Sequence, residues 1–193
     1  MYKWINMEII WRKNVYKWKF TKVDIADMKL NNWNIIPYEI VSRINNIPAV
    51  SALIENITNN TFVLVEQYRA PVDKKVIELV AWICDKPIPY IDIIREEIQE
   101  ETWYIAKNIE LIMANNPNSP WIISELSNKY YAQVEWERWK QRLEDSEEIK
   151  VLEFEKMDLF KYLQSKEKEW ILISSGIYSV IWNMLSRWIN ILD

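Results

Sequence analysis

The scarcity of glycine is the feature that most constrains how this chain can fold. Glycine supplies the positive φ values and the close backbone approaches that turns and helix ends require. It makes up about 7% of an average protein, whereas this chain of 193 residues has one glycine and twelve tryptophans. A fold with many turns must therefore use another residue at such positions, and tryptophan is the residue in excess.

Several tryptophans stand in turn or linker positions. Trp33 follows two asparagines between extended runs, where Asn-Gly would be a standard hairpin signal. Trp121 follows Ser-Pro, and Trp136 and Trp139 stand in a charged linker. A tryptophan-rich surface that stacks on ligands or partners is one interpretation. We favour the hypothesis that most of these tryptophans stand for glycine in the natural protein.

Codon reassignment would explain such a replacement. A few bacterial lineages read UGA as glycine, whereas common alternative translation tables read it as tryptophan. The Ile-, Asn- and Lys-rich sequence fits an AT-rich genome, and Gly176 would then come from an ordinary glycine codon. UGG codons for Trp82, Trp103 and Trp121 would refute the hypothesis. It does not explain the absence of histidine, which excludes histidine-based catalysis and metal ligation.

Composition limits the class of protein. Half of the residues are hydrophobic, so the chain can bury a core, and the net charge of −4 argues against a nucleic-acid groove. The single cysteine, Cys84, excludes an internal disulfide and suits a reducing compartment. Charges interrupt every apolar run of residues 1–14, which excludes a signal peptide and a membrane span there. We expect a cytoplasmic protein with no nucleic-acid or membrane partner.

Strand and helix patterns alternate along the chain, which predicts an α/β or α+β class around a mixed sheet. Strands are expected in residues 15–30 and 34–43, in a hairpin formed by 49–56 and 61–69, and in 75–83, 108–114, 127–135 and 149–157. Helices are expected in residues 90–102, 157–168 and 174–189, with an acidic loop at 136–148.

The predicted helix 90–102 has an acidic face. With about 100° of rotation per residue, Glu97, Glu100 and Glu101 fall within about 100° of arc. Clustered carboxylates repel one another unless a cation is present, and Mg²⁺ or Mn²⁺ prefers oxygen ligands. A solvated helix face is the alternative. The neighbouring apolar stripe consists of Ile91, Ile94 and Ile98.

With glycine restored at 82 and 103, the segment reads ELVAGICDKPIPYIDIIREEIQEETGY. It resembles the Nudix hydrolase signature, G-x5-E-x7-R-E-U-x-E-E-x-G-U, without insertion. Two departures do not depend on the glycine hypothesis: Ile88 replaces the first glutamate, and Glu96 replaces the arginine, with Arg95 one place early. That arginine helps to orient carboxylates in the family. A Nudix-fold module that binds a nucleotide without efficient turnover therefore stays open as an alternative.

The resemblance extends to the ADP-ribose pyrophosphatase branch of the family. Residues 63–82 match the strand and loop that lead into the signature, and Pro120 resembles a downstream marker. The resemblance implies a Nudix α/β/α sandwich around a mixed sheet in residues 46–193. Residues 1–45 would be a β-rich segment for dimerisation and substrate binding, so a homodimer is expected.

The implied reaction is Mg²⁺- or Mn²⁺-dependent hydrolysis of ADP-ribose to AMP and ribose 5-phosphate. Another nucleoside diphosphate sugar or dinucleotide stays open as the substrate. A catalytic base is expected on the acidic loop, where we favour Glu147 over Glu148, and a plain surface loop is the alternative. By resemblance, the metal ligands are the carbonyl of Ala81 and the carboxylates of Glu97, Glu100 and Glu101, of which Glu101 also counts as catalytic.

The resemblance also implies substrate-binding residues. Phe20 and Tyr38 match the two aromatics that sandwich adenine, either within one subunit or with one from each, although ordinary strand packing would also explain them. Arg69 matches an arginine on the diphosphate, which suits a bidentate guanidinium, or else forms an ion pair at the rim. Arg43 and Glu78 match positions near the ligand.

Overall fold

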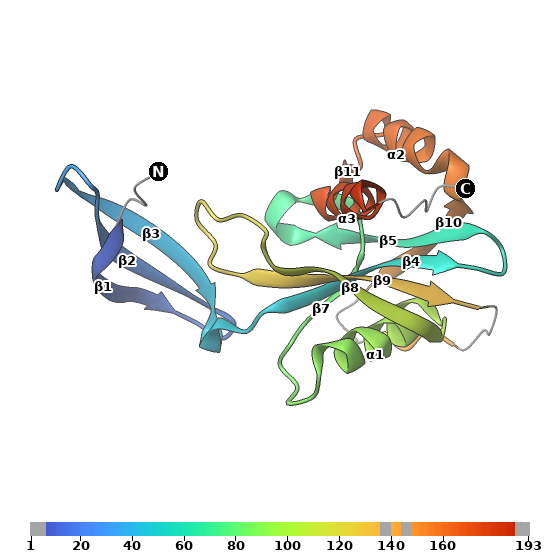
Figure 1. Ribbon diagram of the computed structural model, residues 1–193, viewed down its shortest axis with the longest axis horizontal. Coiled ribbons are helices and arrows are strands. Elements are labelled where there is room, and N and C mark those ends of the chain that lie inside the picture. The colour runs from blue at the N-terminus through green and yellow to red at the C-terminus, as the bar shows by residue number, and fades with distance from the viewer. Residues whose placement is uncertain (1–6, 136–139, 144–147, 188–193) are drawn as a thin grey trace. The chain divides into compact units, whose positions relative to one another are not determined.

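The computed structural model describes residues 7–135, 140–143 and 148–187. The chain forms two compact units, of which the first comprises Met1–Pro48 and Pro117–Leu126 and the second Ala49–Asn116 and Ser127–Asp193. Both units contain strands, and the α-helices of the described residues lie in the second (Figure 1). No helix in the described ranges is long and apolar enough to cross a membrane.

The first unit is an antiparallel meander. The strand predicted over residues 15–30 is divided by a turn in which the Trp18 N–H donates to the Thr21 carbonyl at 2.9 Å, and the strand before that turn begins earlier, at Glu8. Its sheet has the order β1-β2-β3, followed by a short 3-10 helix, η1. Residues 117–126 join this unit through the backbone: the Val41 N–H donates to the Ile122 carbonyl at 2.8 Å and the Ser124 N–H to the Val41 carbonyl at 3.0 Å. The bounds are β1 (Glu8–Lys17), β2 (Thr21–Lys29), β3 (Ile35–Arg43) and η1 (Ile44–Asn46).

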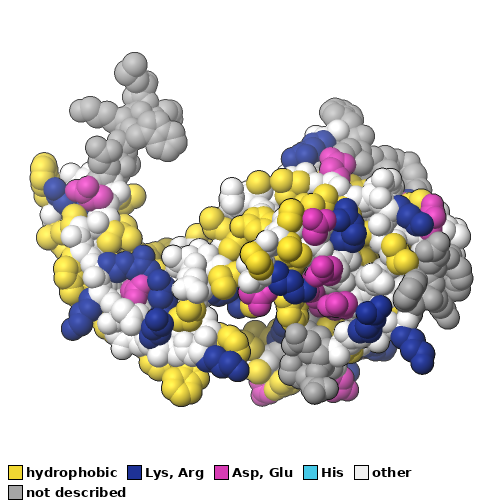
Figure 2. All heavy atoms as spheres, turned by 90° about the horizontal axis from the view of Figure 1, so that it is seen from below, with side chains coloured by type: hydrophobic (Ala, Val, Ile, Leu, Met, Phe, Trp, Pro, Cys, Tyr) yellow, Lys and Arg dark blue, Asp and Glu magenta, His cyan; other side chains and the backbone are white. Residues whose placement is uncertain are grey.

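This unit buries few apolar side chains. Every residue of β1 is exposed, including Ile9 and Trp11, and hydrophobic side chains lie open to solvent on the unit (Figure 2). Its buried Asp24 carboxylate accepts hydrogen bonds from Asn14 and Arg12. The Asn14 bond, followed by the Arg12 bond and charge, lowers the pKa of Asp24 against the opposing effect of burial. The strands of this unit therefore carry exposed apolar side chains, of a kind that marks interaction surfaces in other proteins.

The second unit contains the large mixed sheet that the strand pattern predicted. Its strands run in the order β11-β6-β5-β4-β9-β8, with β10 paired to β5 and β7 paired to β4. The hairpin predicted from the sequence is present as β4 (Ala49–Asn56) and β5 (Thr61–Arg69). The other strands are β6 (Lys74–Glu78), β7 (Val80–Ile83), β8 (Ala106–Pro117), β9 (Leu126–Val134), β10 (Ile149–Glu155) and β11 (Leu172–Ile173).

The strand predicted over residues 75–83 is divided in the structure. Its first part, β6, pairs with β5, and its second part, β7, pairs with β4. Leu79 lies between the two parts, where the chain changes partner. The change places β7 beside the first half of β4, directly before the segment that leads into helix α1 (Tyr90–Thr102).

Helices cover both faces of this sheet, which gives the α/β/α layering expected for residues 46–193 (Figure 1). Helix α1 contributes Ile93, Ile94 and Ile98 to one core cluster, whereas α2 (Leu159–Lys168) and α3 (Ser175–Ser186) belong to the other. Side chains along β5 alternate between the two clusters, as the two-residue period of a strand requires. Short 3-10 helices η2 (Ala70–Val72) and η3 (Lys156–Asp158) precede β6 and α2.

Three tryptophans adopt backbone conformations that favour glycine. Trp33, Trp103 and Trp170 have φ values of 70°, 63° and 63°, and every other described residue with positive φ is an asparagine or aspartate. Asparagine and aspartate tolerate this left-handed region, whereas a bulky side chain there is a genuine outlier. The one glycine, Gly176, lies in α3 without a positive φ. The backbone therefore supports the glycine hypothesis at these three positions.

Candidate functional site

The acidic helix α1 covers the range predicted from the sequence, Tyr90–Thr102. Ile94 and Ile98 are fully buried as expected, and Ile93, which the predicted stripe omitted, is buried with them. Glu97 and Glu101 are only 3% and 2% exposed, so these two carboxylates belong to the buried side of the helix. Residues four apart on a helix are neighbours on one face. Two buried carboxylates therefore lie one turn apart, while Glu100 is half-buried beside them.

The end of α1 depends on residue 103. Trp103 is the C-cap in the left-handed conformation, and its N–H donates to the Gln99 carbonyl at 3.1 Å. Helices commonly end with glycine in this conformation. At the other glycine position, the indole nitrogen of Trp82 is buried without a hydrogen-bond partner among the described residues. Both observations favour glycine over tryptophan at positions 82 and 103.

The residue after the cap, Tyr104, anchors the end of the helix to the sheet. Tyr104 is fully buried, and its hydroxyl donates to Glu153 Oε2 at 2.8 Å. The other oxygen of Glu153 accepts from Thr61 Oγ1 at 2.6 Å and from Asn56 Nδ2 at 3.0 Å. Burial opposes ionisation of Glu153, but these hydrogen bonds prevail and lower its pKa. Burial, followed by the bond to Glu153, raises the pKa of Tyr104.

Lys86 lies on the segment between β7 and α1 and faces the helix. Its Nζ is 2.7 Å from Glu96 Oε2 and 3.9 Å from Glu97 Oε1. The hydrogen bond to Glu96 is the largest cause of a raised pKa for Lys86, and the charges of Glu96, Glu97 and Glu100 add to it. Glu96, which departs from the signature, is thus paired with the ammonium group of Lys86. Ile88, the other departure, packs against the core cluster beneath α1.

The acidic loop is tied to the C-terminal end of α1. The Gln141 side-chain amide donates to the Glu101 carbonyl at 2.7 Å and to the Ile149 carbonyl at 3.2 Å. The Arg142 N–H donates to the Glu100 carbonyl at 2.9 Å. Glu147, the favoured catalytic base, lies outside the described residues, and Glu148 is exposed.

The carboxylate oxygens of Glu97 and Glu101 are of the kind that a hard cation prefers. Buried carboxylates are unfavourable unless a positive charge compensates them, and Mg²⁺ commonly takes one or two protein carboxylates together with substrate phosphates and water. Within residues 7–135, 140–143 and 148–187, no three acidic or cysteine side chains gather closely enough to hold a metal on their own. Glu97 and Glu101 could therefore hold a cation only together with a main-chain carbonyl, substrate phosphates or water. Ala81, the expected carbonyl ligand, lies in β7, which packs against α1.

The predicted adenine-binding aromatics both lie in the first unit. Tyr38 pairs with Ala26 across β3 and β2, whereas Phe20 precedes β2, six positions away from Ala26. At about 3.3 Å per residue, the two rings are separated by roughly 20 Å along the sheet within one chain. A sandwich made by these residues therefore needs one ring from each of two chains. Phe20 is exposed, as such a role requires.

The predicted substrate arginines are both paired with carboxylates. Arg43 bonds to Glu125 on the segment that joins the first unit, and Arg69 Nε donates to Glu78 Oε1 at 2.7 Å in the second. Burial raises the pKa of Glu78, and the charge and hydrogen bond of Arg69 oppose that effect. The structure thus brings Arg69 and Glu78 together as an ion pair. An ion pair without a ligand role remains the alternative.

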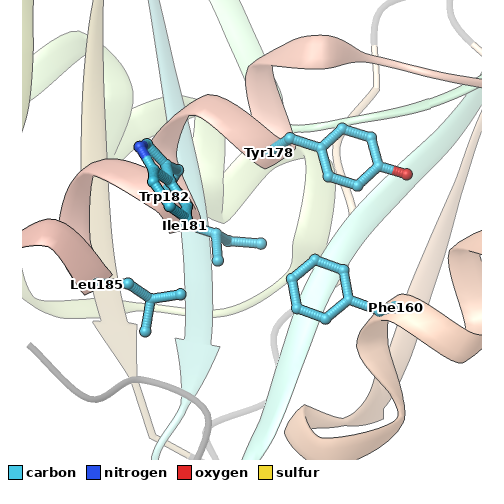
Figure 3. A pocket seen from close by; sticks show the side chains of 5 residues that line it. All are labelled: Phe160, Tyr178, Ile181, Trp182 and Leu185. Atoms are coloured by element: carbon cyan, nitrogen blue, oxygen red, sulfur yellow. The ribbon is translucent and has the colours of Figure 1, made fainter.

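An apolar hollow of about 310 Å³ lies elsewhere, between α2 and α3 (Figure 3). Phe160 and Tyr178 stack across it with ring centroids 6.4 Å apart. Ile181 belongs to the opposite core cluster from α1, so the hollow is on the other face of the sheet from the acidic helix. Trp182 forms part of its wall. The hollow contains none of the predicted site residues.

Sequence reasoning missed Lys86, Gln141 and Glu153. Lys86 could have been suspected as the nearest lysine before an acidic helix, but its partner depends on how the β7–α1 segment folds. Gln141 and Glu153 carry no signal in the sequence, because their partners lie 40 and 49 residues away in the chain.

No protein-family model matches this chain. It is 26% identical over 168 residues to a methanol dehydrogenase activator of Bacillus methanolicus, covering 86% of this chain and 88% of the relative. It is 25% identical over 167 residues to an ADP-ribose pyrophosphatase of Bacillus subtilis (strain 168), covering 86% and 87%. A crystal structure of an ADP compounds hydrolase matches with a TM-score of 0.62 at 15% identity, covering 80% of this chain and 83% of that one. These similarities confirm the expected fold and support a Nudix-like family.

Proposed function

We propose that this protein is a Nudix-like hydrolase that uses Mg²⁺ or Mn²⁺ to cleave the diphosphate of ADP-ribose or a related nucleoside diphosphate sugar. The observation that carries the proposal is the pair of buried carboxylates, Glu97 and Glu101, one turn apart on α1. A relative at 25% identity is named as an ADP-ribose pyrophosphatase, and a solved structure with the same fold is named as an ADP compounds hydrolase. The products would be AMP and a sugar phosphate.

Glu97, Glu101 and the Ala81 carbonyl would hold the cation, with Glu100 assisting. When bound, the cation neutralises diphosphate charge and acidifies a bound water. A carboxylate on the acidic loop, Glu147, accepts the proton of the attacking water. The water oxygen forms a bond to one phosphorus, the bond from that phosphorus to the bridging oxygen breaks, and the bridging oxygen leaves with the other phosphate.

Each unit carries residues that we expect to bind substrate. The guanidinium of Arg69 suits diphosphate oxygens, and Glu78 holds it in place. Phe20 of one chain and Tyr38 of a second would sandwich the adenine, with Arg43 nearby. The protein would then act as a homodimer through the exposed strands of its first unit. One free cysteine suits the reducing cytoplasm, where we place the protein.

A second candidate is a Nudix-fold protein that binds a nucleotide or a partner protein without efficient turnover. Ile88 and Glu96 favour it, because the signature has a carboxylate and a guanidinium at these positions. One relative is named as an activator of a dehydrogenase. AMP release and ADP-ribose binding, measured in the same preparation, therefore distinguish the two candidates.

The test uses protein with glycine restored at Trp82 and Trp103, incubated with Mg²⁺ and ADP-ribose while AMP is quantified by chromatography. We expect AMP release that EDTA abolishes. Glu97→Gln and Glu101→Gln each keep the side-chain shape and should lower the rate by about a hundredfold, since loss of several kcal/mol of charge stabilisation has that effect. Glu110→Gln, on an exposed position of β8, is the matched control. Tight ADP-ribose binding with no AMP release would refute the enzyme and favour the binding module.

A further inference from the structure

Lys86 connects an exposed carboxylate of α1 with a buried one. Its Nζ is 2.7 Å from Glu96 Oε2 and 3.9 Å from Glu97 Oε1. The side chain of Glu96 is 47% exposed, whereas that of Glu97 is 4% exposed. The Lys86 side chain is itself 41% exposed and can move. The ammonium group of Lys86 therefore has two partners within reach, on neighbouring residues of the helix.

The two partners differ in their need for a positive charge. Water stabilises the exposed Glu96 carboxylate, but Glu97 has little water around it and depends more strongly on a nearby cation. A divalent cation at Glu97 would meet this need and would repel an ammonium only a few ångströms away. Lys86 already has its short hydrogen bond to Glu96, so it can withdraw from Glu97 without losing every partner.

We propose that Lys86 is a positioning residue that shares its charge with Glu97 in the cation-free protein and withdraws to Glu96 when a divalent cation binds. The inference rests on the proposed function, because it takes Glu97 as a cation ligand. Glu96 then has a definite role: it holds the displaced ammonium away from the bound cation. The glutamate at this position and the lysine ten residues earlier work as a pair.

The test measures Mn²⁺ binding by electron paramagnetic resonance, without substrate, in the glycine-restored protein. Lys86→Met removes the competing ammonium and should tighten Mn²⁺ binding about three- to fivefold, the effect of a partly exposed ion pair. Glu96→Gln leaves Lys86 with Glu97 as its nearer partner and should weaken Mn²⁺ binding by a similar factor. In the Lys86→Met background, the same Glu96→Gln change should have almost no effect.

Arg95→Met is the matched control. Arg95 precedes Glu96 on the same helix and pairs with Asp92, and both side chains are about as exposed as those of the Lys86–Glu96 pair. Removing Arg95 changes the net charge as Lys86→Met does but leaves the Glu97 contact intact. We expect Mn²⁺ affinity within about twofold of the parent, because exposed charges at longer range are screened.

The possible results separate this inference from the proposed function. If Arg95→Met and Lys86→Met tighten Mn²⁺ binding equally, the effect comes from net charge and the role of Lys86 is overturned, while the proposed function stands. The same follows if Glu96→Gln weakens Mn²⁺ binding as much in the Lys86→Met background as in the parent protein. Weaker Mn²⁺ binding in Lys86→Met would also overturn the role of Lys86, since a purely structural lysine gives that result. Failure of the parent protein to bind Mn²⁺ would overturn the cation site of the proposed function and the inference with it. Circular dichroism and thermal unfolding verify that each variant is folded.

Discussion

The side-chain amide of Gln141 donates a hydrogen bond to the main-chain carbonyl of Glu101 at 2.7 Å. The carbonyls of the last helical turn have no partner within the helix, so a side chain from elsewhere can satisfy them. Because the same amide also bonds to the Ile149 carbonyl, it connects the end of the acidic helix with the start of β10. A loop residue thereby fixes the turn of helix that carries a buried carboxylate of the candidate site.

Gln141→Ala should impair catalysis more than substrate binding. The substitution removes two hydrogen bonds and should lower the free energy of unfolding by about 1–2 kcal/mol. Loss of a residue that orients metal-binding groups typically costs about 10-fold or more, so we expect kcat to fall by about that factor with little change in KM. Steady-state hydrolysis of ADP-ribose and urea unfolding measure the two effects. Gln164→Ala, on an exposed position of α2, is the control, and an equal loss of activity there would contradict the role of Gln141.

Glu153→Gln should weaken the dependence of stability on acid pH. Hydrogen bonds from Thr61, Tyr104, Asn59 and Asn56 lower the pKa of Glu153 in the folded protein below its usual value of 4.5, in spite of burial. A lowered folded-state pKa gives stability that is present above the unfolded pKa and is lost as pH falls through the folded pKa.

The parent protein should therefore lose stability as pH falls below about 4.5, and Glu153→Gln should lose less over the same range. At pH 7 the variant should be less stable by about 1 kcal/mol at most, because Glu153 is exposed on β10 and water screens its interactions. Urea unfolding between about pH 3.5 and 7 measures both effects, because this range includes the pH at which an ordinary glutamate titrates. Glu155→Gln, exposed on the same strand, is the control. Parallel stability curves for the parent and Glu153→Gln would refute the assignment.

Trp170→Gly should stabilise the protein. Trp170 has a φ of 63° and an exposure of 80%, so the substitution relieves the backbone while removing little packing. A non-glycine residue in the left-handed region lowers the stability of the fold by about 1–3 kcal/mol. The contact of Lys74 with the Trp170 ring, which the substitution removes, contributes about 0.5–1 kcal/mol in the opposite direction. We expect thermal unfolding at a higher temperature.

Trp121→Gly is the matched control for this change. Trp121 is 79% exposed but is not among the residues with positive φ. Glycine there only increases the freedom of the unfolded chain, so the variant should be no more stable than the parent. Equal responses of Trp121 and Trp170 would contradict the backbone explanation. The codons for Trp82, Trp103 and Trp121 test the recoding itself.

Ile9→Glu should disrupt self-association. Ile9 is 51% exposed on β1, in a sheet that has little core of its own. If a second copy covers this strand, a buried carboxylate without a partner would weaken the dimer by at least about tenfold. Analytical ultracentrifugation measures the change. Ile57→Glu, at a position 44% exposed between β4 and β5, should leave the association unchanged. A monomeric parent protein would refute the homodimer.

The sequence by itself determined the local elements. Two β-rich runs joined by the polar segment 57–60 predicted the β4–β5 hairpin, and the isoleucine spacing predicted α1 with its glutamates, because these patterns depend only on neighbouring residues. The excess of tryptophan over glycine also indicated Trp33 and Trp121 as turn positions, of which Trp33 has a positive φ and Trp121 does not.

Only the tertiary structure decided which residues meet. The division of β6 from β7 at Leu79 follows from a change of strand partner that no local pattern encodes. Burial of Glu97, its contact with Lys86 and the bond from Gln141 to the end of α1 likewise depend on how separate segments pack. Local periodicity specifies which face of an element is apolar, whereas charge pairing across the site is set by three-dimensional packing.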